Sequence, residues 1–176
     1  MLALCFVAFA AFSGTVKHEV LRSGESAHND SLPVGKAVPD FTLPDRAGTS
    51  VSLRKVTPAK KLVVVEFWGA WCGGCRLQMP SLEKLYRDTT NKGLEILAVD
   101  VGDSTPALDA YLRRKPVSFP VLRDSDGAVT KRFGVHAFPT TVLVEPDGRI
   151  ARVIEGVEPY MSNEVAMMLR ARTRKP

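Results

Sequence analysis

The sequence has few cysteines, no long apolar run and no strong excess of one charge. Three cysteines in 176 residues are too few for a fold that depends on several disulfides. The apolar run Leu2–Phe12 is shorter than the roughly 20 residues of a membrane-spanning helix. The 24 basic and 19 acidic residues give a net charge of +5, and no aromatic residues interleave the basic cluster Arg170–Lys175, so we expect no nucleic-acid partner. The length suits one domain with its own core.

The N-terminus predicts export. Leu2–Phe12 has the length of the apolar segment of a signal peptide, and Ala8–Ala10 or Ala11–Ser13 provides a cleavage site of small residues. No Lys or Arg precedes this run, so an uncleaved anchor or a buried strand stays an alternative. We expect a signal peptide over residues 1–13 and a periplasmic or other extracytoplasmic location. Cleavage of this signal peptide would remove Cys5 from the mature protein. The membrane would be touched only through an uncleaved N-terminus.

Residues 14–33 are polar, mixed in charge and without periodicity, which is typical of a flexible linker. His18 and His28 lie in this segment, and isolated histidines in a linker are expected to be solvated side chains and not metal ligands. The folded domain is expected over residues 34–173.

Two cysteines stand between a predicted strand and a predicted helix. Leu62–Val65 is an apolar, β-branched run typical of a strand buried on both faces, and apolar residues recur at helical spacing over Arg76–Arg87. Cys72 and Cys75 therefore lie at a turn that leads into a helix, where free backbone N–H groups and the helix dipole favour a thiolate. A zinc half-site is the alternative, but no second Cys or His pair has suitable spacing. Arg76 stands where a haem-attachment motif has histidine.

The segment EFWGAWCGGC, residues 66–75, resembles the active-site segment of thioredoxin-like proteins. The wider chain is similar to the TlpA/ResA branch of extracytoplasmic thiol–disulfide oxidoreductases, which is related to the AhpC/TSA family. Further matching segments are Val38–Asp45, Phe119–Leu122, Phe133–Thr141 and Glu145–Arg149. This resemblance covers roughly residues 34–170 and implies a thioredoxin fold, an α/β architecture with a central mixed β-sheet flanked by helices, an N-terminal β-hairpin and a central α/β insertion near residues 103–124.

Local patterns place the remaining elements. Apolar and polar residues alternate on both sides of a Pro-Asp-Arg-Ala-Gly turn, which predicts a β-hairpin. Ser104 before Thr105-Pro106 predicts the start of a helix. The turn Pro146–Gly148 joins two strands. The predicted strands and helices are Phe41–Leu43, Ser50–Leu53, Leu94–Val101, Ala107–Lys115, Phe119–Leu122, Gly127–Phe133, Thr140–Glu145, Arg149–Glu155 and the amphipathic Pro159–Arg170.

The resemblance assigns roles to residues at the turn. Cys72 would be the nucleophile that attacks a substrate disulfide, and Cys75 would resolve the mixed disulfide. Pro139 matches a proline whose peptide bond is cis and abuts the cysteines in the family. A substrate groove would be shaped by four neighbours of these residues, Trp71, Gly73, Gly74 and Phe138. Trp68, in contrast, is expected in the core.

Glu66 interrupts an apolar strand, where a carboxylate is unfavourable unless it is paired or protonated, so its pKa should be raised. It matches the buried acid of cytoplasmic thioredoxins, which implies a proton relay to Cys75. The alternative is a surface carboxylate paired with Lys60 or Lys61. Two departures from the family are Gly74, in place of proline, and Gln78, where many ResA-like proteins have glutamate. Gln78 weakens any close assignment to cytochrome c maturation.

The sequence thus predicts a thiol–disulfide oxidoreductase that reduces disulfides of exported proteins. We expect no cofactor and no metal, a monomer, protein dithiol or disulfide substrates, and an upstream thiol electron donor. A thiol-dependent peroxidase is an alternative, although Trp68–Trp71 lacks the Thr and Pro that such a site needs before its cysteine. A non-enzymatic Cu(I)-handling protein using Cys72, Cys75 and His136 is another.

Overall fold

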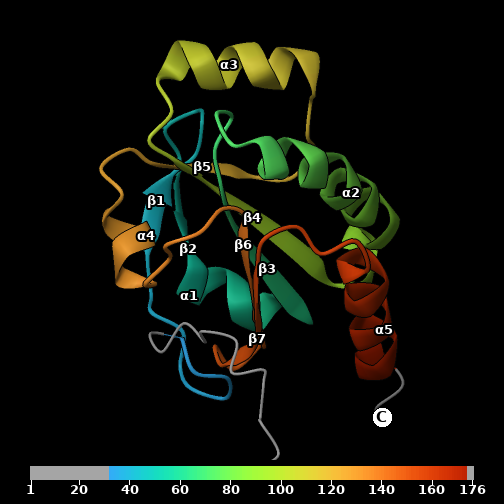
Figure 1. The fold of residues 1–176 in the computed structure, drawn as a ribbon. Coiled ribbons are helices and arrows are strands. Elements are labelled where there is room, and N and C mark those ends of the chain that lie inside the picture. Colours follow the sequence, from blue (N-terminus) through green and yellow to red (C-terminus); the bar gives the residue numbers. More distant parts are fainter. Residues whose placement is uncertain (1–31, 174–176) are drawn as a thin grey trace, which may run out of the picture.

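The computed structural model describes residues 32–173. The main sheet has five strands in the order β5-β4-β3-β6-β7, and a separate hairpin pairs β1 with β2 (Figure 1). The strands are β1 (Thr42–Pro44), β2 (Ser50–Ser52), β3 (Leu62–Trp68), β4 (Leu94–Val101), β5 (Val121–Asp124), β6 (Thr140–Val144) and β7 (Ile150–Glu155). The helices are α1 (Leu53–Val56), α2 (Gly73–Thr89), α3 (Thr105–Arg114), α4 (Ala128–Arg132) and α5 (Met161–Thr173), with short 3-10 turns η1 (Thr57–Ala59) and η2 (Thr90–Lys92).

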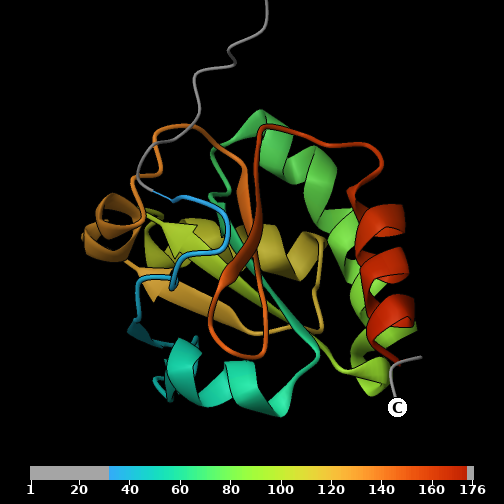
Figure 2. The ribbon, with the colours of Figure 1, turned by 90° about the horizontal axis from the view of Figure 1, so that it is seen from below.

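The sheet is mixed, as predicted. β3 runs parallel to β4 and antiparallel to β6, while β5 adds to β4 in parallel and β7 to β6 antiparallel. The parallel pairs are connected through α2 and α3, because parallel strands need a crossover. α2 and α5 lie side by side against one face (Figures 1 and 2).

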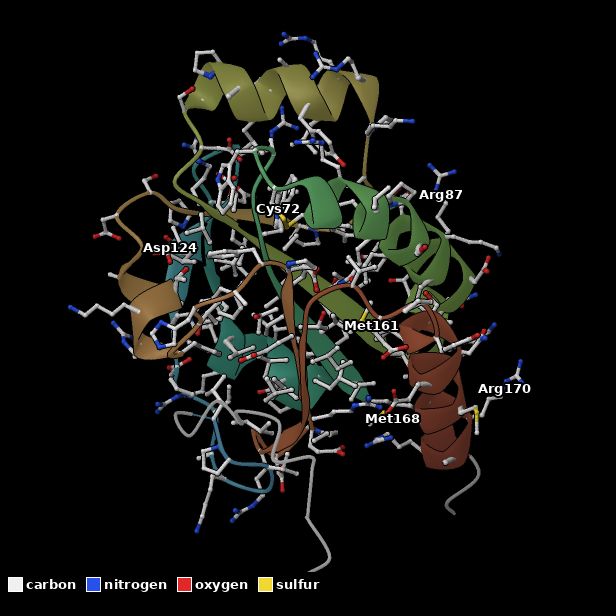
Figure 3. The ribbon with its side chains drawn as sticks, in the orientation of Figure 1. Cys72, Arg87, Asp124, Met161, Met168 and Arg170 are labelled. Atoms are coloured by element: carbon white, nitrogen blue, oxygen red, sulfur yellow. A yellow bond between two sulfur atoms is a disulfide. The ribbon has the colours of Figure 1, made fainter. Side chains whose placement is uncertain are left out.

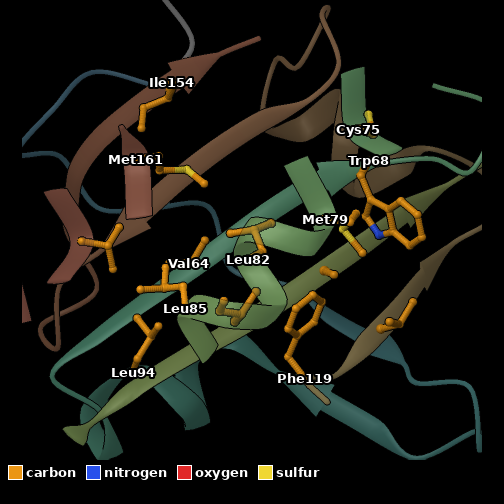
Figure 4. Packing of buried hydrophobic residues seen from close by; sticks show 14 of the residues in the cluster. Val64, Trp68, Cys75, Met79, Leu82, Leu85, Leu94, Phe119, Ile154 and Met161 are labelled. Carbon is orange, nitrogen blue, oxygen red and sulfur yellow. The ribbon is translucent and has the colours of Figure 1, made fainter. Parts of the chain in front are cut away.

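Every residue of β3 is buried, because helices cover both faces of the sheet. Side chains alternate along the strand: Val64 and Trp68 join a cluster with residues of α2, α3 and α5, whereas Val65 and Phe67 join a second cluster with α4 and the hairpin. Cys75 lies at the same end of the first cluster as Trp68 (Figure 4). The expectation of Trp68 in the core is confirmed.

Several element boundaries differ from the sequence prediction. The active-site helix begins at Gly73, three residues before the apolar repeat of Arg76–Arg87, because Cys72 is the N-cap residue and the first turn, Gly73–Cys75, carries no apolar periodicity. Leu53 starts α1, a short helix that the alternating pattern did not predict. β5 begins after Pro120, whose lack of an N–H group limits ladder pairing, and its carbonyl accepts a hydrogen bond from the Ala98 amide.

The folded body reaches slightly further toward the N-terminus than predicted. Leu32, assigned to the linker from sequence, is buried among the residues of the second cluster. The signal-peptide prediction and Cys5 lie outside the described residues. Among residues 32–173, no helix is both long and apolar enough to cross a bilayer.

Candidate active site

The two cysteines occupy the start of α2, where they form a disulfide (Figure 3). Cys72 is the N-cap residue in extended conformation, and the backbone N–H of Cys75 donates to its Sγ atom at 3.1 Å. Cys72 retains 7% of its surface, whereas Cys75 is fully buried. A sulfur at this position meets the positive end of the helix dipole, so the thiolate of Cys72 is favoured once the disulfide is reduced.

The predicted groove residues gather around the cysteines. The Phe138–Pro139 peptide bond is cis, as the resemblance implied. The rings of Trp71 and Phe138 meet edge to face with centroids 5.1 Å apart, and Trp71 is 55% exposed. A Cβ atom on Gly74 would lie 3.1 Å from a methyl group of Val157 and 3.3 Å from Cδ of Pro139, so Gly74 allows these segments to approach closely.

Glu66 is fully buried, on the face of β3 that packs against α2. One carboxylate oxygen accepts a hydrogen bond from the Gln78 side-chain amide at 2.7 Å, and the other accepts one from the Thr141 hydroxyl at 2.6 Å. Burial raises the pKa of Glu66 to about 8, and these two hydrogen bonds oppose the rise. The alternative pairing with Lys60 is absent, because Lys60 forms its ion pair with Glu95 at 2.8 Å.

Gln78 contributes to this site although the sequence assigned it no role. It lies one helical turn beyond Cys75, it is buried, and its amide also donates to Thr141. Gln78 thereby links Glu66 to the helix that carries both cysteines. A signal existed in the sequence, because a polar side chain on the inward face of an amphipathic helix requires a buried partner.

The segment before Cys72 is held by contacts that the sequence did not predict. Asp103 accepts the Ala70 amide, Arg76 donates to the Ala70 carbonyl, and the Trp71 indole donates to the Val101 carbonyl. The only sequence signal was a pair of aspartates, Asp100 and Asp103, at the end of an otherwise apolar strand.

His136 does not complete a metal site. Its side chain is exposed, and within residues 32–173 no group of three or more His, Cys, Asp and Glu side chains is placed to hold a metal ion. The site therefore offers a dithiol, a buried carboxyl group and an exposed apolar rim. That combination suits exchange between thiols and disulfides.

Known proteins that are similar to this chain are named for thiol–disulfide exchange. Residues 34–153 match the AhpC/TSA family. Thiol-disulfide oxidoreductase ResA from Bacillus cereus is 32% identical over 136 residues, 77% of this chain and 78% of that protein. ResA from Bacillus subtilis is 34% identical over 130 residues, 74% and 72% of the two chains. A Chlorobium tepidum protein assigned as thiol:disulfide interchange protein DsbE superposes with a TM-score of 0.72 at 28% identity, covering 80% of this chain and 98% of its own. This chain therefore belongs to the AhpC/TSA family and is a thioredoxin-fold thiol–disulfide oxidoreductase.

Proposed function

We propose that the protein acts as a reductase of disulfides in exported proteins. The thiolate of Cys72 attacks a substrate disulfide, forms a mixed disulfide and releases one substrate thiolate. The thiolate of Cys75 then attacks the Cys72 sulfur, which re-forms the internal disulfide and releases the second substrate thiolate. Two electrons pass from the protein to the substrate, and an upstream dithiol protein restores the reduced form.

The observation that carries this proposal is the unequal exposure of the two sulfurs. Cys72 is the N-cap residue of α2 and keeps part of its surface exposed to solvent, whereas Cys75 is fully buried. An incoming disulfide can therefore reach only Cys72. The exposed rim of Trp71, with Phe138 against it and Gly73 beside it, offers an apolar surface for the polypeptide around the substrate cysteine, close to Gly74 and Pro139.

Glu66 supplies the proton that this cycle needs. In the oxidised protein its raised pKa leaves it protonated at neutral pH, so it can donate a proton to Cys75 when a donor thiol opens the disulfide. In the opposite half of the cycle the ionised carboxylate accepts the proton of Cys75. A carboxyl group with a pKa near the working pH is suited to both steps.

The reduction potential of the Cys72–Cys75 pair tests the direction of electron flow. We expect a value below about −200 mV, toward the roughly −270 mV of thioredoxin and well below the roughly −120 mV of a strong disulfide donor. Equilibration with dithiothreitol and glutathione buffers, read by alkylation and mass, measures it. A potential near −120 mV would show that the protein oxidises its partners.

We further propose that residues 1–13 are a cleaved signal peptide, 14–33 a linker, and 34–173 the catalytic domain of an exported monomer. The mature protein is then expected to begin between about Ala11 and Gly14 and to lack Cys5. Intact-mass analysis of protein recovered from its native host gives the mature terminus, and size-exclusion chromatography with light scattering gives the oligomeric state. A full-length product in the cytoplasm contradicts the export proposal and leaves Cys5 as a third thiol.

A further inference from the structure

The peptide units before the nucleophile are held from two sides. The Ala70 N–H donates to a carboxylate oxygen of Asp103 at 2.5 Å, and the Ala70 carbonyl accepts from the Arg76 guanidinium at 2.8 Å. The indole N–H of Trp71 donates to the Val101 carbonyl at 3.0 Å. The loop between β3 and α2 is thus tied to the segment between β4 and α3 and to α2 itself.

Asp103 is itself firmly placed. Its side chain is buried, and its backbone carbonyl accepts a hydrogen bond from the Arg123 guanidinium at 2.9 Å. The same guanidinium donates to the Thr105 hydroxyl and lies 3.5 Å from a carboxylate oxygen of Asp100. Since Asp100 pairs in register with Arg123 on one side and Trp68 on the other, the sheet determines where Asp103 stands.

The buried aspartates do not need to hold two negative charges. Burial, and then the neighbouring Asp103, raises the pKa of Asp100 to about 8, while Arg123 opposes the rise. Asp100 is therefore protonated at neutral pH. A protonated Asp100 does not repel the carboxylate of Asp103, so Asp103 remains available to the Ala70 amide.

Gly69 shows how closely this loop is packed. A Cβ atom at this position would overlap the indole nitrogen and the adjoining carbon of Trp71. The indole lies against the Gly69 backbone while its ring remains exposed to the solvent. Trp71 and Cys72 are therefore presented together, and their placement depends on the contacts of Ala70.

We propose that Asp103 is a positioning residue, which holds the Ala70 amide so that Trp71 and Cys72 meet the substrate in a productive geometry. This inference rests on the proposed role of Cys72 as the attacking thiol. The end of β4 and the segment that follows it then contribute to the reaction, because Val101 at the end of β4 supplies the carbonyl that binds Trp71, and Asp103 lies just beyond it. Arg76 holds the next peptide unit, through the Ala70 carbonyl, from the helix side.

Asp103→Ala removes the acceptor and is expected to slow capture of a disulfide by Cys72 by about tenfold or more, because small displacements of a reacting group reduce rates strongly. Asp103→Asn keeps an oxygen that accepts the Ala70 N–H and is expected to stay within about threefold of the parent. Asp109→Ala, which removes a carboxylate of α3 that pairs with Arg46, is the matched control and should match the parent.

Two readouts separate positioning from loss of the fold. Capture is measured in a Cys75→Ser background with a cysteine peptide carrying a nitrothiobenzoate group, which releases one coloured thiolate for each peptide bound. Quenching by acrylamide reports Trp71 selectively, since Trp68 is fully buried. Asp103→Ala should increase the quenching, and Gly69→Ala, which displaces the indole by steric overlap, calibrates the size of that signal.

Arg76→Leu provides a second test of whether the contacts of Ala70 position Cys72. Arg76 is exposed, so its replacement does not disturb the core. It should shift capture and quenching in the same direction as Asp103→Ala. Parental capture and quenching in either Asp103→Ala or Arg76→Leu would overturn the proposal while leaving the redox function intact. A parent protein that captures no disulfide would refute the proposed function instead, and the quenching measurements would still show whether Asp103 holds the loop.

Discussion

Cys75→Ser is expected to accumulate mixed disulfides with partner proteins, whereas Cys72→Ser is expected to trap almost none. The buried Cys75 cannot meet a substrate sulfur, and Cys72 alone stands at the helix start with part of its surface free. Without Cys75 the mixed disulfide has no internal thiol to resolve it. The difference between the two variants should therefore be close to all or none.

Alkylation at low pH, followed by non-reducing electrophoresis and mass spectrometry, detects the trapped adducts. The double variant with both cysteines replaced by serine controls for non-specific association. Equal trapping by Cys72→Ser and Cys75→Ser would refute the assignment of Cys72 as the attacking thiol and Cys75 as the resolving thiol. The captured proteins would also identify the substrates and the upstream donor.

Glu66→Gln is expected to lower the rate of disulfide exchange by about 10²-fold, the low end for losing a general acid–base group. The glutamine keeps the shape and can hydrogen-bond to Gln78 and Thr141, the partners of the parent carboxyl. The loss should fall on the step in which Cys75 gains or loses a proton. Capture by Cys72 should be nearly unchanged, the reverse of the pattern expected for Asp103→Ala.

Stopped-flow measurement of both steps from about pH 5 to 9, where perturbed thiols and carboxyl groups titrate, tests this assignment. In the parent, the rate of resolution should rise with pH, reach half its maximum near pH 8 and level off above it, as Glu66 ionises at its pKa of about 8. Glu66→Gln should lack that inflection. Exchange as fast as the parent at every pH would show that Glu66 has no part in proton transfer.

The same variant should also be more stable, in a manner that depends on pH. The folded-state pKa of Glu66, about 8, lies above its ordinary value of 4.5, so between these values the unfolded chain loses a proton that the folded chain keeps. The free energy of unfolding of the parent therefore falls as pH rises through this range, by about 1.4 kcal/mol per pH unit. Glu66→Gln does not titrate, so its advantage should grow to several kcal/mol by pH 8, then level off. Urea unfolding at a series of pH values measures the difference.

The sequence by itself determined the chemistry and the order of the elements. An apolar β-branched run, two cysteines one helical turn apart and a helical repeat are local signals, since strand, turn and helix formation depend on near neighbours. They sufficed to predict β3, the turn that leads into α2 and the pair of cysteines at that turn. The sequence also predicted a raised pKa for Glu66 if its carboxyl group is buried, but it left a surface carboxylate paired with Lys60 or Lys61 as the alternative. The structure decided between them, because both faces of β3 are covered and Glu66 is fully buried.

Only the tertiary structure decided which side chains surround the two sulfurs. The partners of Glu66 are 12 residues away at Gln78 and 75 residues away at Thr141, and Asp103 reaches Ala70 across 33 residues. These contacts depend on the register of β3 against β4 and β6, which no local pattern encodes. Buried polar groups must find partners, but which partner each one meets is determined when the strands pair and α2 packs onto them.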